Sequence, residues 1–220
     1  MHRSLYAFAA ILAVTCGACV HLTAGVTPPA APFVAIGTTQ TCLESSRAVT
    51  TAPSLRDVDP ERIVLANELA DLPVAGLASR TISETTTYRT PDDYLAGSHV
   101  LNPDARRAAF DRAGFRGGEY VGFRSSDDFY DAIVLRFASA DQTLAYFQVH
   151  AHDVCQDATV SMRPAHSAGI AFMDTDGVAH ATFVVGDTEV SLHVCSCVED
   201  TDRLGLVSRW ADAVTAQLSA

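Results

Sequence analysis

The sequence predicts an α+β fold: a two-layer domain with a mainly antiparallel sheet, helices packed on one face of it, and a disulfide staple. Three observations lead to this fold class. Strand patterns follow one another with short turns between them, helical patterns separate these runs, and cysteines remain in the chain beyond an export signal. Runs of antiparallel strands divided by helices are typical of α+β domains. Helices on one side would leave the other sheet face partly solvated.

The first two helices are predicted from the signals at their ends. Asp59 can cap a helix that begins at Pro60 and ends before Pro73, because aspartate accepts hydrogen bonds at a helix N-terminus and proline suits the first helical position. The second helix occupies 102–113, with Asn at its start and Gly114 as its stop. Glycine is the usual residue just past a helix end.

Strands are predicted at 85–89, 115–123 and 129–137, and in a three-stranded meander over 169–198. Alternating apolar residues make 129–137 (FYDAIVLRF) the strongest strand pattern, and it should form a hairpin with 115–123. Asp176-Gly177 and Gly186-Asp187 are turn dipeptides that divide the meander into its strands.

Two more helices complete the predicted order of elements. Ser139 and Gln142 form a Ser-x-x-Gln capping box, which starts a helix that runs to about Val154. The last helix runs from about Thr201 to Leu218. Its apolar residues recur at helical spacing and form one stripe, bordered by Trp210: Leu204, Val207, Ala211, Val214 and Leu218.

The N-terminus has the pattern of a lipoprotein signal peptide over 1–18. Arg3 precedes a ten-residue apolar run, and the small residues Gly17 and Ala18 precede Cys19. We expect Cys19 to be acylated, so that the protein is anchored by lipid to the outer face of the cytoplasmic membrane. The open alternatives are acylation of Cys16, a secreted form cut after Ala24, and an uncleaved anchor over 5–22.

Beyond the signal, we divide the chain into an extended tether over 19–41, without charges and with three prolines, and one α+β domain over 42–220. Without the signal, 14 arginines face 26 acidic residues and no lysine, a net charge of −12. This acidity argues against nucleic acid as a partner, because nucleic acids bind clustered positive charge. It also argues against electrostatic binding to anionic lipids, so the attached lipid would have to anchor the protein by itself.

Four cysteines remain after the signal is removed: Cys42, Cys155, Cys195 and Cys197. An even number in an exported protein indicates two disulfides, with three connectivities. A bond between Cys195 and Cys197 would close a very small loop. We therefore expect Cys155 to pair with one of these two and Cys42 with the other. A redox-active Cys-x-Cys is a lesser alternative.

The candidate site is a pair of histidines on neighbouring strands of the meander. If Gly186-Asp187 is a two-residue turn, His180 and His193 lie opposite each other, about 5 Å apart at Cβ. Two imidazoles this close could share a metal ion, or repel each other when protonated and so sense acid pH. No third ligand is evident, and two solvated histidines on an exposed sheet face are the plainer interpretation.

Two other metal-like patterns are explained more simply. His150 and His152 lie two residues apart on a predicted helix and point in different directions, so they are interpreted as exposed side chains rather than ligands shared with Cys155. The stretch 174–177 (DTDG) lacks most ligands of a calcium loop and is interpreted as a hairpin turn.

Several local features carry a resemblance over roughly 102–218. They are AGF-x-G at a helix exit (113–117), RFASA at a strand-to-helix step (136–140), a cysteine that closes that helix, and a cysteine on the last strand before a terminal helix. The chain resembles uncharacterised actinobacterial exported lipoproteins and, more distantly, the extracellular sensor domain of mycobacterial Ser/Thr kinases. Val154 departs from the sensor pattern, which has Trp ahead of the helix cysteine. The resemblance implies a disulfide-stapled α+β domain that binds something, and it transfers no catalytic residue.

We therefore expect an exported, lipid-anchored envelope protein that acts as a non-catalytic binding or sensor-like module. Its ligand would be a small molecule or a protein, and no cofactor is assigned. The sequence contains no G-x-S-x-G, P-loop, G-x-G-x-x-G or H-E-x-x-H motif. One alternative is an envelope hydrolase with a dispersed Ser/His/Asp site that uses His166, His180 or His193. The other is a purely structural envelope protein, with a flat apolar patch in place of a pocket.

Overall fold

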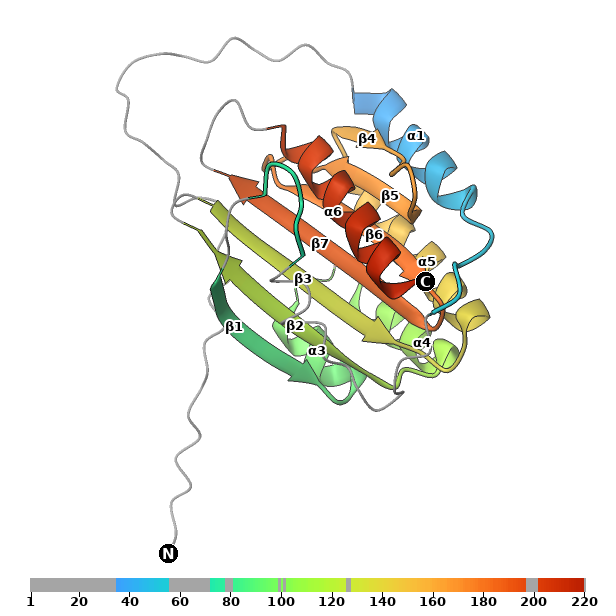
Figure 1. Cartoon of the computed structure of the whole chain (residues 1–220). Helices are drawn as coiled ribbons and strands as arrows, with labels where there is room; N and C mark the ends of the chain where they lie inside the picture. The colour runs from blue at the N-terminus through green and yellow to red at the C-terminus, as the bar shows by residue number, and fades with distance from the viewer. Residues whose placement is uncertain are drawn as a thin grey trace, which may run out of the picture.

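The computed structural model of the chain describes residues 35–55, 72–77, 81–98, 100, 102–125, 128–196 and 202–219. Within these residues a seven-stranded antiparallel sheet runs in the order β1-β2-β3-β7-β6-β5-β4 (Figure 1). The strands are β1 (Thr81–Tyr88), β2 (Gly117–Arg124), β3 (Asp128–Arg136), β4 (Val160–Met162), β5 (Ala168–Met173), β6 (Ala179–Val185) and β7 (Thr188–Ser196). The α+β class and the antiparallel sheet are confirmed.

The described helices are α1 (Ala35–Arg47), α3 (Pro91–Gly97), α4 (Pro103–Ala113), α5 (Ala140–Val154) and α6 (Arg203–Leu218); a 3-10 turn, η2 (Cys155–Asp157), follows α5. The predicted end signals act as expected in α4, where the Asn102 side chain accepts a hydrogen bond from the backbone of Ala105 and Gly114 adopts a φ of +62°. Ser139 caps α5 by accepting from the backbone N–H of Gln142 at 3.3 Å. None of the described helices combines the length and the apolar character needed to cross a bilayer.

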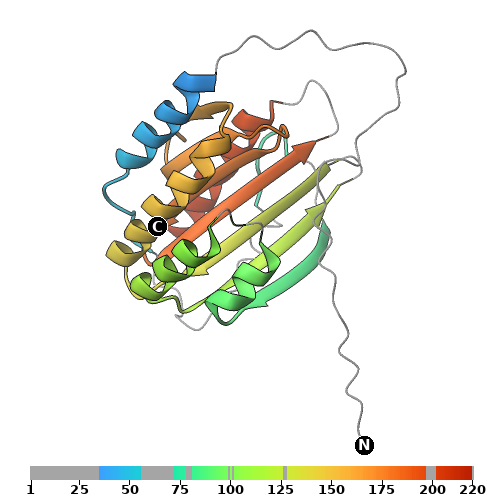
Figure 2. The ribbon, with the colours of Figure 1, turned by 180° about the vertical axis from the view of Figure 1, so that it is seen from behind.

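Helices cover both faces of the sheet, which corrects the prediction that they pack on one face. Helix α6 lies on the face seen in Figure 1, whereas α1, α3, α4 and α5 lie on the face seen from behind in Figure 2. Phe183 of β6 packs in the same cluster as Trp210 of α6, and the next residue, Val184, packs with Phe147 of α5. One face of β6 is apolar and the other carries His180, Thr182 and Val184; Thr182 and Val184 are buried, so both faces of the strand are covered.

Three further differences concern the first half of the chain. Helix α1 begins at Ala35, so 35–41 are helical and not part of an extended tether. The helix predicted over 60–72 lies almost wholly outside the described residues. Helix α3 was not predicted, although Pro91 starts it and Thr90 and Asp93 form a complete capping box at its N-terminus.

Candidate functional site

The disulfide that is described joins Cys42 to Cys155, with their Cα atoms 5.6 Å apart. The expected pairing of Cys155 with Cys195 or Cys197 is therefore wrong. The reason is α1, which the sequence analysis did not predict and which packs against α5 and η2 at the point where Cys155 lies. Cys195 is also disulfide-bonded, and its partner lies outside the described residues. Cys19 and Cys197, which the sequence analysis assigned to a lipid and to a disulfide, lie outside the described residues too.

The predicted histidine pair forms as the register required. His180 of β6 pairs directly with His193 of β7 across the Gly186-Asp187 turn. The two imidazole rings have centroids 4.7 Å apart and cross at 68°. The ring of His180 also stacks on Phe172 of β5, with an interplanar angle of 5°. Each ring is thus held by packing as well as by its strand.

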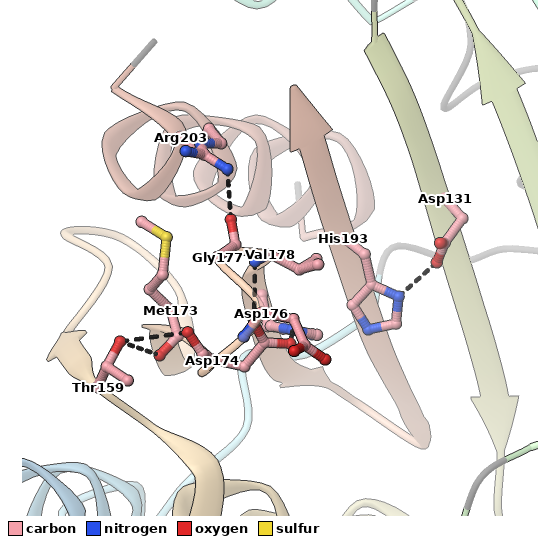
Figure 3. Close-up of polar contacts among 10 residues, drawn as sticks. Asp131, Thr159, Met173, Asp174, Asp176, Gly177, Val178, His193 and Arg203 are labelled. Atoms are coloured by element: carbon pink, nitrogen blue, oxygen red, sulfur yellow. Dashed lines mark hydrogen bonds and ion pairs between the residues drawn. The ribbon is translucent and has the colours of Figure 1, made fainter. Parts of the chain in front are cut away.

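Each histidine has an aspartate of its own. Figure 3 shows the contact between the His193 ring and the Asp131 carboxylate of β3. His193 Nδ1 lies 2.5 Å from Asp131 Oδ1, and His180 Nε2 lies 2.8 Å from Asp174 Oδ2 at the end of β5. The four side chains are between 12% and 25% exposed. Asp131 was not predicted as a site residue, because it reaches His193 only through the pairing of β3 with β7.

The two histidines differ in their pKa values. Burial alone would lower the pKa of His193, but attraction to the Asp131 carboxylate and its hydrogen bond outweigh this and raise that pKa above the usual value. Burial lowers the pKa of His180 in spite of its hydrogen bond to Asp174, and repulsion from His193 lowers it further. One ring therefore favours the proton and the other favours the neutral form.

The Asp174 carboxylate also organises the turn between β5 and β6. Its Oδ1 accepts hydrogen bonds from the backbone N–H groups of Asp176 and Val178, both at 2.9 Å. Gly177 has a φ of +78°, and its carbonyl accepts from Arg203 Nη1 at 2.6 Å (Figure 3). The stretch 174–177 is thus a hairpin turn, as predicted. Among the described residues, no group of three or more His, Cys, Asp or Glu side chains is placed to hold a metal ion. Metal binding by the two histidines stays a prediction.

A second polar cluster lies on the same face, under α4 and α5. His150 Nδ1 lies 2.7 Å from Glu189 Oε1, and both side chains are buried. Arg106 of α4 donates to the hydroxyl of Tyr146 at 3.1 Å and to Asp153 at 2.7 Å. The expectation that His150 is exposed is wrong, because its partner on β7 is brought to it only by the packing of α5 on the sheet. His152 is exposed, as expected.

A cavity of about 530 Å³ lies between the segment after α1 and the loop before β5. Its lining consists of residues 48–53 and 163–168. Gln148 fixes one wall by donating to the carbonyls of Ser46 and Val49, and the Gly186 N–H holds the carbonyl of Pro53 at 2.6 Å. Asp212 of α6 fixes the other wall by accepting from the backbone N–H of His166 and the hydroxyl of Ser167, both at 2.8 Å.

One wall of this cavity tests the hydrolase alternative, because hydrogen bonds join His166 and Ser167 to Asp212 of α6. The Ser167 hydroxyl donates directly to Asp212 and accepts from Thr215 at 2.9 Å. His166 joins this group through its backbone, so no imidazole stands between serine and carboxylate as a base, which a Ser/His/Asp site requires. In the described residues, the contacts of His180 and His193 include no serine hydroxyl.

No known protein family matches the chain. No curated protein matches it either. Among solved structures, the extracellular domain of PknH from Mycobacterium tuberculosis is similar at 14% identity and a TM-score of 0.46, over 74% of this chain and all of that one. A likeness this distant carries no statement about ligand or activity, and no enzyme family is indicated.

Proposed function

We propose that this chain is an exported, lipid-anchored, non-catalytic module that binds its ligand in the cavity between 48–53 and 163–168. The observation that carries the proposal is a cavity of about 530 Å³ whose two walls are fixed by hydrogen bonds and by packing. A preformed concave site of this size suits a small ligand. The purely structural alternative predicts no such cavity.

The lining indicates the chemistry of the ligand. It includes the hydroxyl-bearing residues Thr50 and Thr51, the cationic Arg163 and the imidazole of His166, and it includes no carboxylate. Such a lining suits a ligand that carries hydroxyl and carboxylate groups. A soluble cell-wall fragment has both kinds of group and lies in the compartment where the chain is expected.

Export and anchoring rest on the N-terminal pattern and on the cysteines. The described disulfide between Cys42 and Cys155 suits an oxidising compartment. Acylation of Cys19 would hold the domain at the outer face of the membrane, while cleavage after Ala24 would release it. The intact mass of protein extracted from its native membrane separates these outcomes. A diacylglyceryl adduct on a chain starting at Cys19 supports the anchor, and a lipid-free chain refutes it.

Binding is tested by titrating ¹⁵N-labelled protein with purified muropeptides. We expect amide shifts that concentrate at Thr50, Thr51 and His166. Ala165→Trp should abolish them by filling the cavity, since Ala165 is exposed and lines it. Ala105→Trp, at an exposed position on α4, is the matched control and should leave the shifts intact. Shifts that are absent, or equal in the two variants, would contradict the proposal.

A further inference from the structure

We propose that His180 and His193 form a proton-sensing pair. The pair takes up its two protons in separate steps, and in acid the repulsion between the two charged rings loosens the turn that joins β5 to β6. This inference is independent of the ligand and of the cavity. It rests on the arrangement of four side chains on one end of the sheet.

The two aspartates that contact the histidines are held in different ways. Asp131 lies within a paired strand, directly opposite His193, and its hydrogen bond crosses from β3 to β7. Asp174 lies at a turn and already accepts two backbone N–H bonds through its other oxygen. His193 therefore has a carboxylate held rigidly by the sheet, while His180 has one that belongs to a hairpin turn.

The charged groups around the pair determine which ring takes the first proton. His193 faces Asp131 from β3 and His180 from β6, and α5 brings His150, with its partner Glu189, within electrostatic range of His193. Both aspartates, Asp131 and Asp174, attract both rings. The more strongly attracted ring, His193, takes the first proton, because its pKa is raised while the pKa of His180 is lowered.

The second proton places two positive charges side by side on the sheet. Two imidazolium rings with centroids 4.7 Å apart repel each other, and the partly buried site screens that repulsion only in part. Asp131 lies within the paired strand β3, whereas Asp174 lies in the turn between β5 and β6, so the turn is the part that yields. The turn contacts α6 through Arg203 and the end of β4 through Thr159, whose hydroxyl donates to the carbonyl of Met173 at 3.0 Å (Figure 3). A movement of the turn would therefore reach both elements.

The test is a side-chain NMR titration of all histidines in the full chain between pH 4 and 9. We expect the imidazole of His193 to titrate above, and that of His180 below, the ordinary histidine value of about 6.5. In His193→Gln, the midpoint of His180 should rise, because the neighbouring charge is gone. The backbone amides of 174–178 and Arg203 should shift with the second, acid titration step in the wild-type chain.

His152→Gln is the matched control, because His152 is exposed on α5 and has neither of these partners. It should leave both midpoints unchanged. The proposal is overturned if the midpoint of His180 is the same in wild type and His193→Gln. It is also overturned if the amides of 174–178 do not respond to the acid step.

Discussion

The two faces of the sheet bury different kinds of side chain, although the same strands form both. One face lies under α6, and the other lies under α3, α4 and α5. On β7, Val190, Leu192 and Val194 point toward α6, whereas the alternate residues Glu189 and His193 belong to the other face. The α6 face is mostly apolar and is filled around Trp210. The opposite face combines apolar clusters with buried Arg106, His150 and Glu189. A sheet that is covered on both sides can thus have a mainly apolar core on one face and bury titratable groups among the apolar clusters of the other.

The largest expected effect comes from the apolar face. Trp210 is fully buried and packs edge-on against Phe123 and Tyr130, with ring centroids 6.1 and 6.3 Å away. Trp210→Ala should lower the free energy of unfolding by about 3–5 kcal/mol, because it leaves a large cavity. Urea denaturation measures this loss. Gln217→Ala, at an exposed position on the same helix, should change stability by less than about 0.5 kcal/mol. A similar loss in both variants would contradict the assignment of α6 as the core helix.

The second effect tests how the opposite face is closed. Replacing both Cys42 and Cys155 by serine opens a loop with a sequence separation of 113 residues. We expect a loss of about 2–4 kcal/mol, because the unfolded chain gains conformational freedom. Amide hydrogen exchange should rise in α1 more than in α6, which the bond does not reach. An equal rise in amide hydrogen exchange in α1 and α6 would show that the disulfide does not stabilise α1 in particular.

The third effect tests the buried polar cluster. Glu189→Gln keeps the shape of the side chain but removes the charge that faces His150. We expect a loss of about 1–3 kcal/mol, because a buried polar partner loses its charge-assisted hydrogen bond. Glu44→Gln, at an exposed carboxylate on α1, is the matched control and should be close to neutral. Equal stabilities of the two variants would mean that the cluster contributes nothing beyond its packing.

The smallest effect is the dependence of stability on pH to which His150, His180 and His193 contribute, on the face under α3, α4 and α5. Burial lowers the pKa of His180 and His150, so the unfolded chain binds more protons and stability should fall as pH drops below about 6.5. The raised pKa of His193 acts in the opposite direction: its contribution is complete in acid and is lost as pH rises through its folded pKa.

Urea midpoints measured between pH 5 and 8 separate these two contributions. His180→Gln should flatten the loss of stability in acid, and His193→Gln should destabilise more at pH 5 than at pH 8. His152→Gln should follow the wild-type curve. Parallel curves for all three variants would refute the difference between the two histidines.

Local signals predicted most of the sheet and its helices well. The Gly186-Asp187 turn sets the register of β6 and β7, and with it the meeting of His180 and His193, because both strands adjoin that turn. Caps at Asn102 and Ser139 placed α4 and α5 for the same reason. The capping box at Thr90 is a local signal of the same kind and marks the start of α3.

The partners of these residues could not be predicted in the same way. Asp131 reaches His193 across 62 residues, His150 reaches Glu189 across 39, and Cys42 reaches Cys155 across 113. By itself, the sequence determined the α+β class, the helix ends, the hairpins and the histidine register, since these depend on hydrogen bonds and turns between near neighbours. The tertiary structure alone decided the covering of both faces, the disulfide pairing and the choice of which carboxylate meets which histidine. Each of these depends on the packing of elements that are distant in the chain, and no local pattern encodes it.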